Sequence, residues 1–367
     1  MRTENRAVYS MHPGGGVKES VERLRGCKTP TTPLFPISFI IRVRLDGVED
    51  RGLYFEKAMP HTSRGLILLV ATGLLVPIVP LVGAQSVERA MVVTVLDRDD
   101  SQVEGLEPDD FVVYEDDALR EVVRVSRDTE PRQIALLVDT SEAASRAIAD
   151  FRNGVSTFID EIDGGHNIAL ISFGGRPRIL MASTREPTRL QKGVGQIFSE
   201  TTTAAYLLDA LRETTEGFVK RGATRPVIVV LTTEGLDYSH IDSRTVLRGL
   251  EEAAVAVHTV VLIDRGFAPR SFGSSGFGDL DNGPLAQWRT ERDRGLNHAP
   301  SISGGSRRDL LTSMSATQAM SEVADELRSQ YLIVYSSPDT LVPPQNREVG
   351  LALDGLTVRQ TPVRATR

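Results

Sequence analysis

Two acidic side chains that could bind a ligand or take part in catalysis follow short apolar runs in the middle of the chain. Asp139 comes directly after 134–138 (IALLV), and Glu234 comes shortly after 227–231 (VIVVL). A short, fully apolar run is typical of a strand buried on both faces of a parallel sheet. Ligands of such sheets bind beyond the carboxyl ends of the strands. Asp139 and Glu234 are therefore candidates for a functional site.

A search for catalytic constellations gives one cluster of acid–base residues. His240 lies close in sequence to Glu234 and Asp237, and a hydrolase could use these groups together with Asp139. The sequence contains no His-Glu-x-x-His pair, and Ser141 stands in Asp-Thr-Ser-Glu-Ala rather than in a Gly-x-Ser-x-Gly elbow. These patterns favour a protein that is not an enzyme, with an exported hydrolase as the alternative.

The composition excludes several classes of partner and cofactor. The formal net charge is −7 and no long basic block occurs, so nucleic acid is not expected as a partner. Cys27 is the only cysteine, which excludes a disulfide framework, a zinc finger and an iron–sulfur centre. The chain has 367 residues, enough for two or three domains.

An uncharged stretch near the N-terminus indicates export. Residues 65–84 read GLILLVATGLLVPIVPLVGA. Pro77 and Pro80 interrupt the stretch, and the helix-compatible part, 66–76, suits the apolar region of a signal peptide better than a spanning helix. We interpret 59–84 as a signal peptide or, if it is not cleaved, a membrane anchor. The protein is then periplasmic, displayed at the cell surface or secreted.

The segment before this stretch does not fit the same plan, because a secretion signal should stand at the start of the chain. We interpret 1–58 as a disordered leader or an upstream misreading of the start, with translation beginning at Met59. The small residues that end at Ala84 suit a cleavage site, which would leave Gln85 first.

The candidate side chains need elements that hold them, and a repeating pattern begins at Gln133. Apolar runs alternate with segments whose apolar residues recur at spacings of three and four, as in amphipathic helices. The alternation predicts a doubly wound, mostly parallel α/β sheet with helices on both faces. His258 lies within a predicted strand and is expected to be a packed core histidine. Strands are predicted at 134–138, 168–173, 227–231 and 257–263, and helices at about 148–162, 188–199, 205–219, 242–254 and 313–329.

Other segments complete the predicted organisation. Residues 87–130 alternate apolar and polar side chains and are predicted to form a small β module. The α/β domain is predicted to span 133–336 and to end with the strand 331–335. Within it, 264–306 is rich in Gly, Ser and Asp and is predicted to be a flexible insertion. Residues 337–367 are predicted to be a β-strand tail.

The ordered series IALLVDTS, NIALISFGG, YLLDAL, PVIVVLTTEGLD and VHTVVLI resembles von Willebrand factor A (vWA) domains. The flanks are similar to those of a bacterial exported subgroup of that family. GLEPDDFVVYEDD (105–117) precedes the domain, and ELRSQYLIVYS (326–336) follows a Gly-Gly turn at 304–305. The resemblance extends over about 90–360.

The resemblance implies a divalent-cation site at the carboxyl edge of the sheet. In the family an Asp-x-Ser-x-Ser loop, a Thr from a second loop and an Asp from a third hold the ion, and a partner's carboxylate can complete the shell. Mg²⁺ prefers such hard oxygen ligands in near-octahedral geometry. Here Asp139 and Ser141 fill the first two positions, but Ala143 stands at the third and has no side-chain oxygen.

The other two loops also depart from the family pattern. The Thr position falls on Ala205, with Thr203 two residues away, and either Thr233 or Glu234 stands for the Asp. The implied site is therefore a degenerate metal-ion-dependent adhesion site. The alternative is that Asp139 and Ser141 only cap the following helix. The candidate metal ligands are Asp139, Ser141, Thr203 and Glu234.

The sequence thus predicts an exported, non-enzymatic module of the binding or adhesion type that takes an unidentified protein partner. No cofactor is required by the sequence, although Mg²⁺ or another divalent cation could occupy the degenerate site. Besides the exported hydrolase, a metal-free envelope scaffold is the other alternative. Membrane anchoring through 65–84 is a further possibility.

The export interpretation predicts the N-terminus of the native protein. We expect intact-mass analysis and N-terminal sequencing to give a chain that begins at Gln85, because the signal is removed after Ala84. A native protein that still contains Cys27 would contradict both the start at Met59 and the cleavage.

Overall fold

The computed structural model describes residues 86–162, 165–200, 203–263, 284–339, 344 and 346–361. The predicted leader (1–58) and signal or anchor (59–84) lie outside these residues. Within them, no helix combines the length and the apolar character that a membrane span requires.

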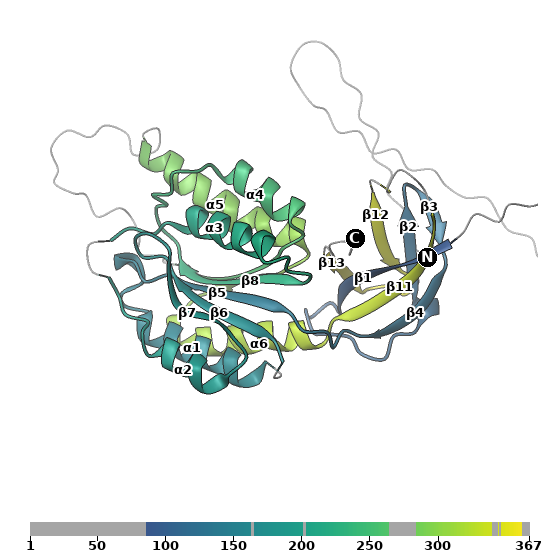
Figure 1. Ribbon diagram of the computed structural model, residues 1–367, viewed down its shortest axis with the longest axis horizontal. Helices are drawn as coiled ribbons and strands as arrows, with labels where there is room; N and C mark the ends of the chain where they lie inside the picture. The colour runs from purple at the N-terminus through teal and green to yellow at the C-terminus, as the bar shows by residue number, and fades with distance from the viewer. Residues whose placement is uncertain are drawn as a thin grey trace, which may run out of the picture. The chain divides into compact units, whose positions relative to one another are not determined.

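A six-stranded sheet forms the centre of the α/β domain, in the order β10-β9-β8-β5-β6-β7. Its first five strands pair in parallel, and the edge strand β7 is antiparallel to β6. The predicted doubly wound, mostly parallel α/β fold is confirmed (Figure 1). The strands are β5 (Gln133–Val138), β6 (Asn167–Ser172), β7 (Arg178–Thr184), β8 (Pro226–Thr233), β9 (Ala256–Leu262) and β10 (Arg307–Leu310).

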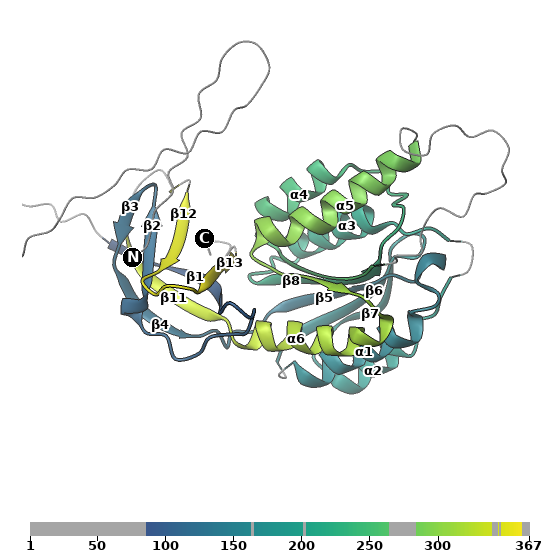
Figure 2. The same ribbon diagram turned by 180° about the vertical axis from the view of Figure 1, so that it is seen from behind.

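Helices cover both faces of this sheet. Figure 1 and, from behind, Figure 2 show α3, α4 and α5 over one face and α1, α2 and α6 over the other. The alternation along β5 explains the two layers, because Leu136 joins the core on one face and Leu137 the core on the other. The helices are α1 (Ile148–Glu161), α2 (Pro187–Val194), α3 (Leu207–Lys220), α4 (Ser243–Glu252), α5 (Pro284–Ser303) and α6 (Ala316–Arg328).

The expectation of a flexible insertion over 264–306 is wrong for its second half. Helix α5 occupies Pro284–Ser303, and the short strand β10 follows it. The Gly-rich composition of the first half led to the expectation of a flexible segment throughout. Leu296 and Ala299 nevertheless have helical spacing, and both are buried among the side chains of α3 and β9. Residues 264–283 lie outside the described part of the chain.

A β-sandwich is assembled from segments on both sides of the α/β domain in sequence. A four-stranded sheet has the order β13-β1-β11-β4, and a three-stranded sheet has the order β12-β2-β3. The predicted β module and β-strand tail therefore meet in one structure around a shared apolar core. The strands are β1 (Ser86–Leu96), β2 (Phe111–Glu115), β3 (Ala118–Arg120), β4 (Val122–Arg127), β11 (Tyr331–Pro338), β12 (Arg347–Leu351) and β13 (Thr357–Thr361).

Strand β11 differs from its predicted place. The sequence analysis assigned 331–335 to the α/β domain, whereas the structure pairs β11 antiparallel with β1 and with β4. The physical reason is that both edges of β11 are satisfied by these two strands, so that β11 is an inner strand of the sandwich.

His258 is a fully buried residue of β9, as predicted, and it belongs to a buried ionic cluster. Its Nδ1 lies 2.9 Å from Ser306 Oγ and 3.7 Å from Glu326 Oε1. The Glu326 carboxylate accepts hydrogen bonds from Arg308 (2.9 Å) and Arg359 (2.8 Å). Burial lowers the pKa of His258 from 6.5 to about 4; Glu326 opposes this shift, and the two arginines reinforce it.

This cluster predicts that acid destabilises the protein. Because the pKa of His258 is lower in the folded state, the unfolded state binds more protons between pH 6.5 and about 4, and stability falls as the pH falls through this window. The loss amounts to about 3 kcal/mol. Urea denaturation at several pH values should show that the free energy of unfolding depends less on pH in His258→Asn than in the native chain. The exposed His298 provides the control, and an equal change with His298→Asn would contradict the assignment.

Candidate functional site

The predicted site residues lie at the carboxyl edge of the parallel sheet. The loops that follow β5, β6 and β8 extend the strand ladders by one residue, since Asp139 N donates to Leu231 O, Phe173 N to Val138 O and Glu234 N to Leu262 O. The loop before α3 is tied to the first of these loops, because Glu200 N donates to Thr140 O at 2.7 Å. The backbone thereby fixes the positions of the side chains at this edge.

Asp139 is completely buried, and both of its carboxylate oxygens accept hydrogen bonds. Oδ1 accepts from the backbone N–H of Ser141 at 2.9 Å. Oδ2 accepts from Thr232 Oγ1 at 2.6 Å and from Arg292 Nη2 at 2.9 Å. The carboxylate therefore organises its own loop and also binds the end of β8 and helix α5.

Arg292 brings a buried positive charge into this edge from α5. Its side chain is 1% exposed. Besides Asp139, its Nη2 donates to Thr232 Oγ1 at 2.5 Å and to the carbonyl oxygen of Thr233 at 2.9 Å. Its Nη1 lies 3.8 Å from Asp237 Oδ2. Removing one partner of such a buried ion pair leaves an uncompensated charge, which typically costs about 3–5 kcal/mol.

Asp237 is a second buried carboxylate at the same edge, and it serves the start of α3. Its Oδ2 accepts from the backbone N–H groups of Leu207 (3.0 Å) and Leu208 (3.4 Å), and its Oδ1 accepts from Ser239 N (2.8 Å). Burial raises the pKa of Asp237, while Arg292 and these hydrogen bonds oppose the rise. Asp237 therefore acts as an N-terminal cap supplied from another loop.

The structure brings together some of the four predicted metal ligands but not all. Ser141 lies beside Asp139, but its buried Oγ has no hydrogen-bond partner among the described residues. Thr203 Oγ1 donates to the carbonyl oxygen of Glu200 at 2.8 Å, in its own loop. Glu234 is half-buried, and its carboxylate makes no hydrogen bond or ion pair within the described part of the chain.

The hydrolase cluster suggested by the sequence does not assemble among the described residues. His240 pairs with Asp209 (Nδ1 to Oδ2, 2.9 Å) rather than with Glu234 or Asp237. Its ring also stacks on Tyr206, with the centroids 5.9 Å apart. The histidine thus has one acidic partner, Asp209, whose backbone N–H donates to Ser239 Oγ at 3.0 Å.

These groups do not fit a resident divalent cation. Mg²⁺ takes several hard oxygen ligands, often from more than one carboxylate. The described residues contain no group of three acidic, histidine or cysteine side chains placed to hold a metal. The carboxylate of Asp139 already faces the guanidinium of Arg292, whose positive charge repels a metal ion at the same position.

Two residues of this site, Thr232 and Arg292, were missed by the sequence analysis. Thr232 directly precedes Thr233 and Glu234, which were the candidates expected from the sequence. Arg292 lay inside the segment predicted to be flexible. A helical spacing was present there, since Trp288, Leu296 and Ala299 recur with Arg292 at intervals of three and four. An arginine on the apolar face of such a helix signals a buried charge that needs a partner.

The strand order and the helices on both faces place this domain in the doubly wound α/β class. Residues 134–236 match the family model of the von Willebrand factor type A domain, and the α/β domain is a vWA domain. The resemblance expected from the sequence is confirmed for this domain. Membership of a bacterial exported subgroup stays a prediction. No curated protein matches the sequence.

The solved structures that this chain matches are distant from it in sequence. Proximal thread matrix protein 1 from the mussel byssus is 13% identical with a TM-score of 0.43, over 59% of this chain and 50% of that chain. This chain thus spans about half of that protein's length. A von Willebrand factor type A protein from Catenulispora acidiphila is 10% identical with a TM-score of 0.40, over 77% of this chain and 74% of that chain. BatB from Bacteroides thetaiotaomicron is 15% identical with a TM-score of 0.36, over 53% of this chain and 98% of that chain.

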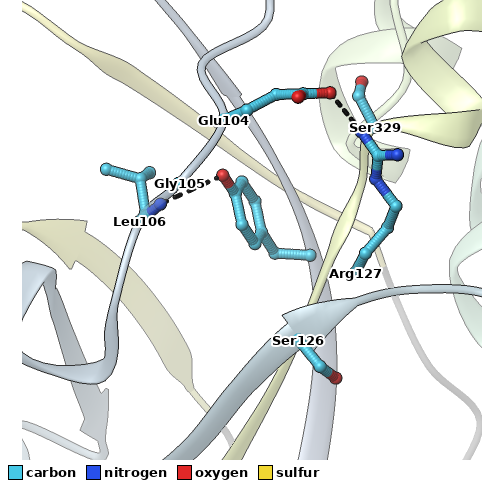
Figure 3. A pocket seen from close by; sticks show the side chains of 7 residues that line it. Glu104, Gly105, Leu106, Ser126, Arg127 and Ser329 are labelled. Carbon is cyan, nitrogen blue, oxygen red and sulfur yellow. Dashed lines mark hydrogen bonds and ion pairs between the residues drawn. The ribbon is translucent and has the colours of Figure 1, made fainter.

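A small pocket of about 240 Å³ is formed by residues outside the carboxyl edge of the sheet (Figure 3). Its walls already bind one another: Arg127 pairs with Glu104, and Tyr331 Oη accepts from Leu106 N at 3.3 Å and donates to Val103 O at 2.9 Å. The pocket shares no residue with the carboxyl edge of the vWA domain. We assign it no ligand.

Gly174 is required for the close approach of two loops at the carboxyl edge. A Cβ atom at this position would lie 2.4 Å from Thr140 C and 2.5 Å from Ser141 N, which are backbone atoms that cannot move aside. We therefore expect Gly174→Ala to destabilise the protein by about 1–3 kcal/mol in chemical denaturation. Gly249 in α4 has open space around its Cβ position, so Gly249→Ala should be neutral or stabilising. Equal effects of the two changes would contradict this account.

Proposed function

We propose that this chain is an exported, non-enzymatic binding module whose vWA domain engages a protein partner through the carboxyl edge of its sheet. The observation that carries this proposal is the vWA domain itself, matched over 134–236, together with exposed apolar side chains beside its carboxyl-edge loops. Exposed apolar groups of this kind are found on surfaces that bind other proteins.

Phe198 and Met314 supply the apolar side chains that support this surface. Phe198 is 60% exposed and Met314 is 80% exposed. Both flank the start of α1, because the guanidinium of Arg152 lies 5.2 Å from the Phe198 ring, and Ser313 hydrogen-bonds to Asp150. Aromatic residues and methionine are enriched at protein interfaces, where their burial contributes most of the apolar contact.

The position of Phe198 connects this surface to the buried site. Phe198 lies between α2 and Glu200, whose backbone N–H donates to Thr140 O in the loop of Asp139. A partner that contacts Phe198 therefore rests on a loop held by the same backbone contacts as the Asp139 loop. This arrangement favours binding to a rigid, preformed surface.

Two further observations support the remaining parts of the proposal. His240 pairs with Asp209 rather than with Glu234 or Asp237, so the acid–base cluster that a hydrolase would use does not assemble among the described residues. The uncharged stretch 65–84 supports export, with retention at the membrane if it is not cleaved. The residues after it contain no cysteine, so an oxidising compartment would not cross-link them.

Site-specific photo-crosslinking in the source organism tests this surface. A photoreactive phenylalanine analogue introduced at Phe198 or Met314 should give one and the same cross-linked protein, because both positions flank the proposed interface. Val219 in α3 is 45% exposed and lies at the opposite end of its helix from the carboxyl edge, which makes it the matched control. An equal adduct at Val219, or none at either apolar position, would count against the proposed surface.

A further inference from the structure

We propose that Arg292 is the resident cation of this vWA site, and that its guanidinium takes the place of a divalent metal ion. This role of Arg292 does not depend on which partner binds. Asp139 and Asp237 are both almost completely buried, and buried carboxylates need a positive charge close by.

Arg292 supplies that charge to both carboxylates. Every ion pair that the described residues make with Asp139 or Asp237 involves this arginine, at 2.9 Å and 3.8 Å respectively. A guanidinium group carries its positive charge as part of the polypeptide chain. The charge at the edge is therefore permanent, and it does not depend on the concentration of metal ions.

The atoms around Arg292 Nη2 are the kinds of ligand that a hard cation collects. They are a carboxylate oxygen of Asp139, the hydroxyl oxygen of Thr232 and the carbonyl oxygen of Thr233. Nη2 makes all three of these contacts, Nη1 donates to Leu236 O at a longer 3.5 Å, and the buried Nε has no hydrogen-bond partner among the described residues. The guanidinium therefore works here chiefly as a point charge with hydrogen-bond donors.

Two hydroxyl groups and two alanines stand at or beside the family's other ligand positions. Ser141 Oγ and Thr233 Oγ1 are buried beside this edge without a hydrogen-bond partner in the described part of the chain. Ala143 and Ala205 stand at two of the family's ligand positions and have no side-chain oxygen. The positive charge that a metal ion would supply in the family comes here from Arg292 on α5. The positive charge at the carboxyl edge is thus supplied by the chain itself and not by a metal ion.

A direct measurement on the native chain tests the proposal without any variant. Mn²⁺ is titrated into the full chain, and its EPR signal, which falls when the ion binds, is recorded. We expect the signal of free Mn²⁺ to persist at millimolar concentration, and Tm to be the same in EDTA and in Mg²⁺, since a ligand that binds the folded state raises Tm. Binding of Mn²⁺ that disappears in Asp139→Ala would overturn the proposal.

Two matched substitutions test the role of the charge. Arg292→Met keeps a long side chain but removes the charge, whereas Arg292→Lys keeps the charge on a single nitrogen. We expect the Met variant to lose several degrees of Tm and the Lys variant to retain most of the native Tm. Arg294, which is half-exposed and pairs with Glu291 on the same helix, is the control, and Arg294→Ala should leave Tm almost unchanged.

The outcomes of this series are decisive in both directions. Equal losses in the Met and Lys variants would show that Arg292 acts through packing alone, and the proposal would be wrong. A Met variant as stable as the native chain would overturn it as well. If the Met variant does not fold, the comparison of Arg292→Lys with the native chain and the Mn²⁺ titration still decide the question.

Discussion

The buried pair of Asp139 and Arg292 is the interaction on which the carboxyl edge of the vWA domain depends. Asp139 holds its own loop through Ser141 N, and it holds the end of β8 through Thr232. Its negative charge is tolerable inside the protein because Arg292 lies against it at 2.9 Å. A buried carboxylate without this partner would be protonated or would force the loops apart. The same contact also anchors α5 to the sheet.

This constraint explains why two loops and a helix that are distant in sequence form one unit. Asp237 caps the start of α3 and lies near the same guanidinium, so α3 and α5 are both held at this edge. In a metal-dependent site the ion would connect these elements and could leave again. A covalently attached cation cannot dissociate, and the edge keeps one arrangement. Such rigidity favours a preformed binding surface next to Phe198 and Met314.

Both ends of the vWA domain are connected to the β-sandwich. The chain enters the domain from β4 and leaves it into β11, and these two strands are hydrogen-bonded neighbours in one sheet. Near this point Arg132 donates to Asp128 and to Gln330, which are separated by most of the domain in sequence. The domain is therefore an insertion between strands of the sandwich, and both of its ends are tied to the same sheet.

The sequence by itself determined the parallel sheet, its helices and the position of Asp139, because buried strands and amphipathic helices leave periodic apolar patterns that are local in the chain. It also indicated that ligand oxygens were missing at Ala143 and Ala205. Only the tertiary structure decided what stands opposite Asp139, since Arg292 is separated from it by 153 positions. Likewise, only the structure placed β11 beside β1, since strand pairing between distant segments has no local signature.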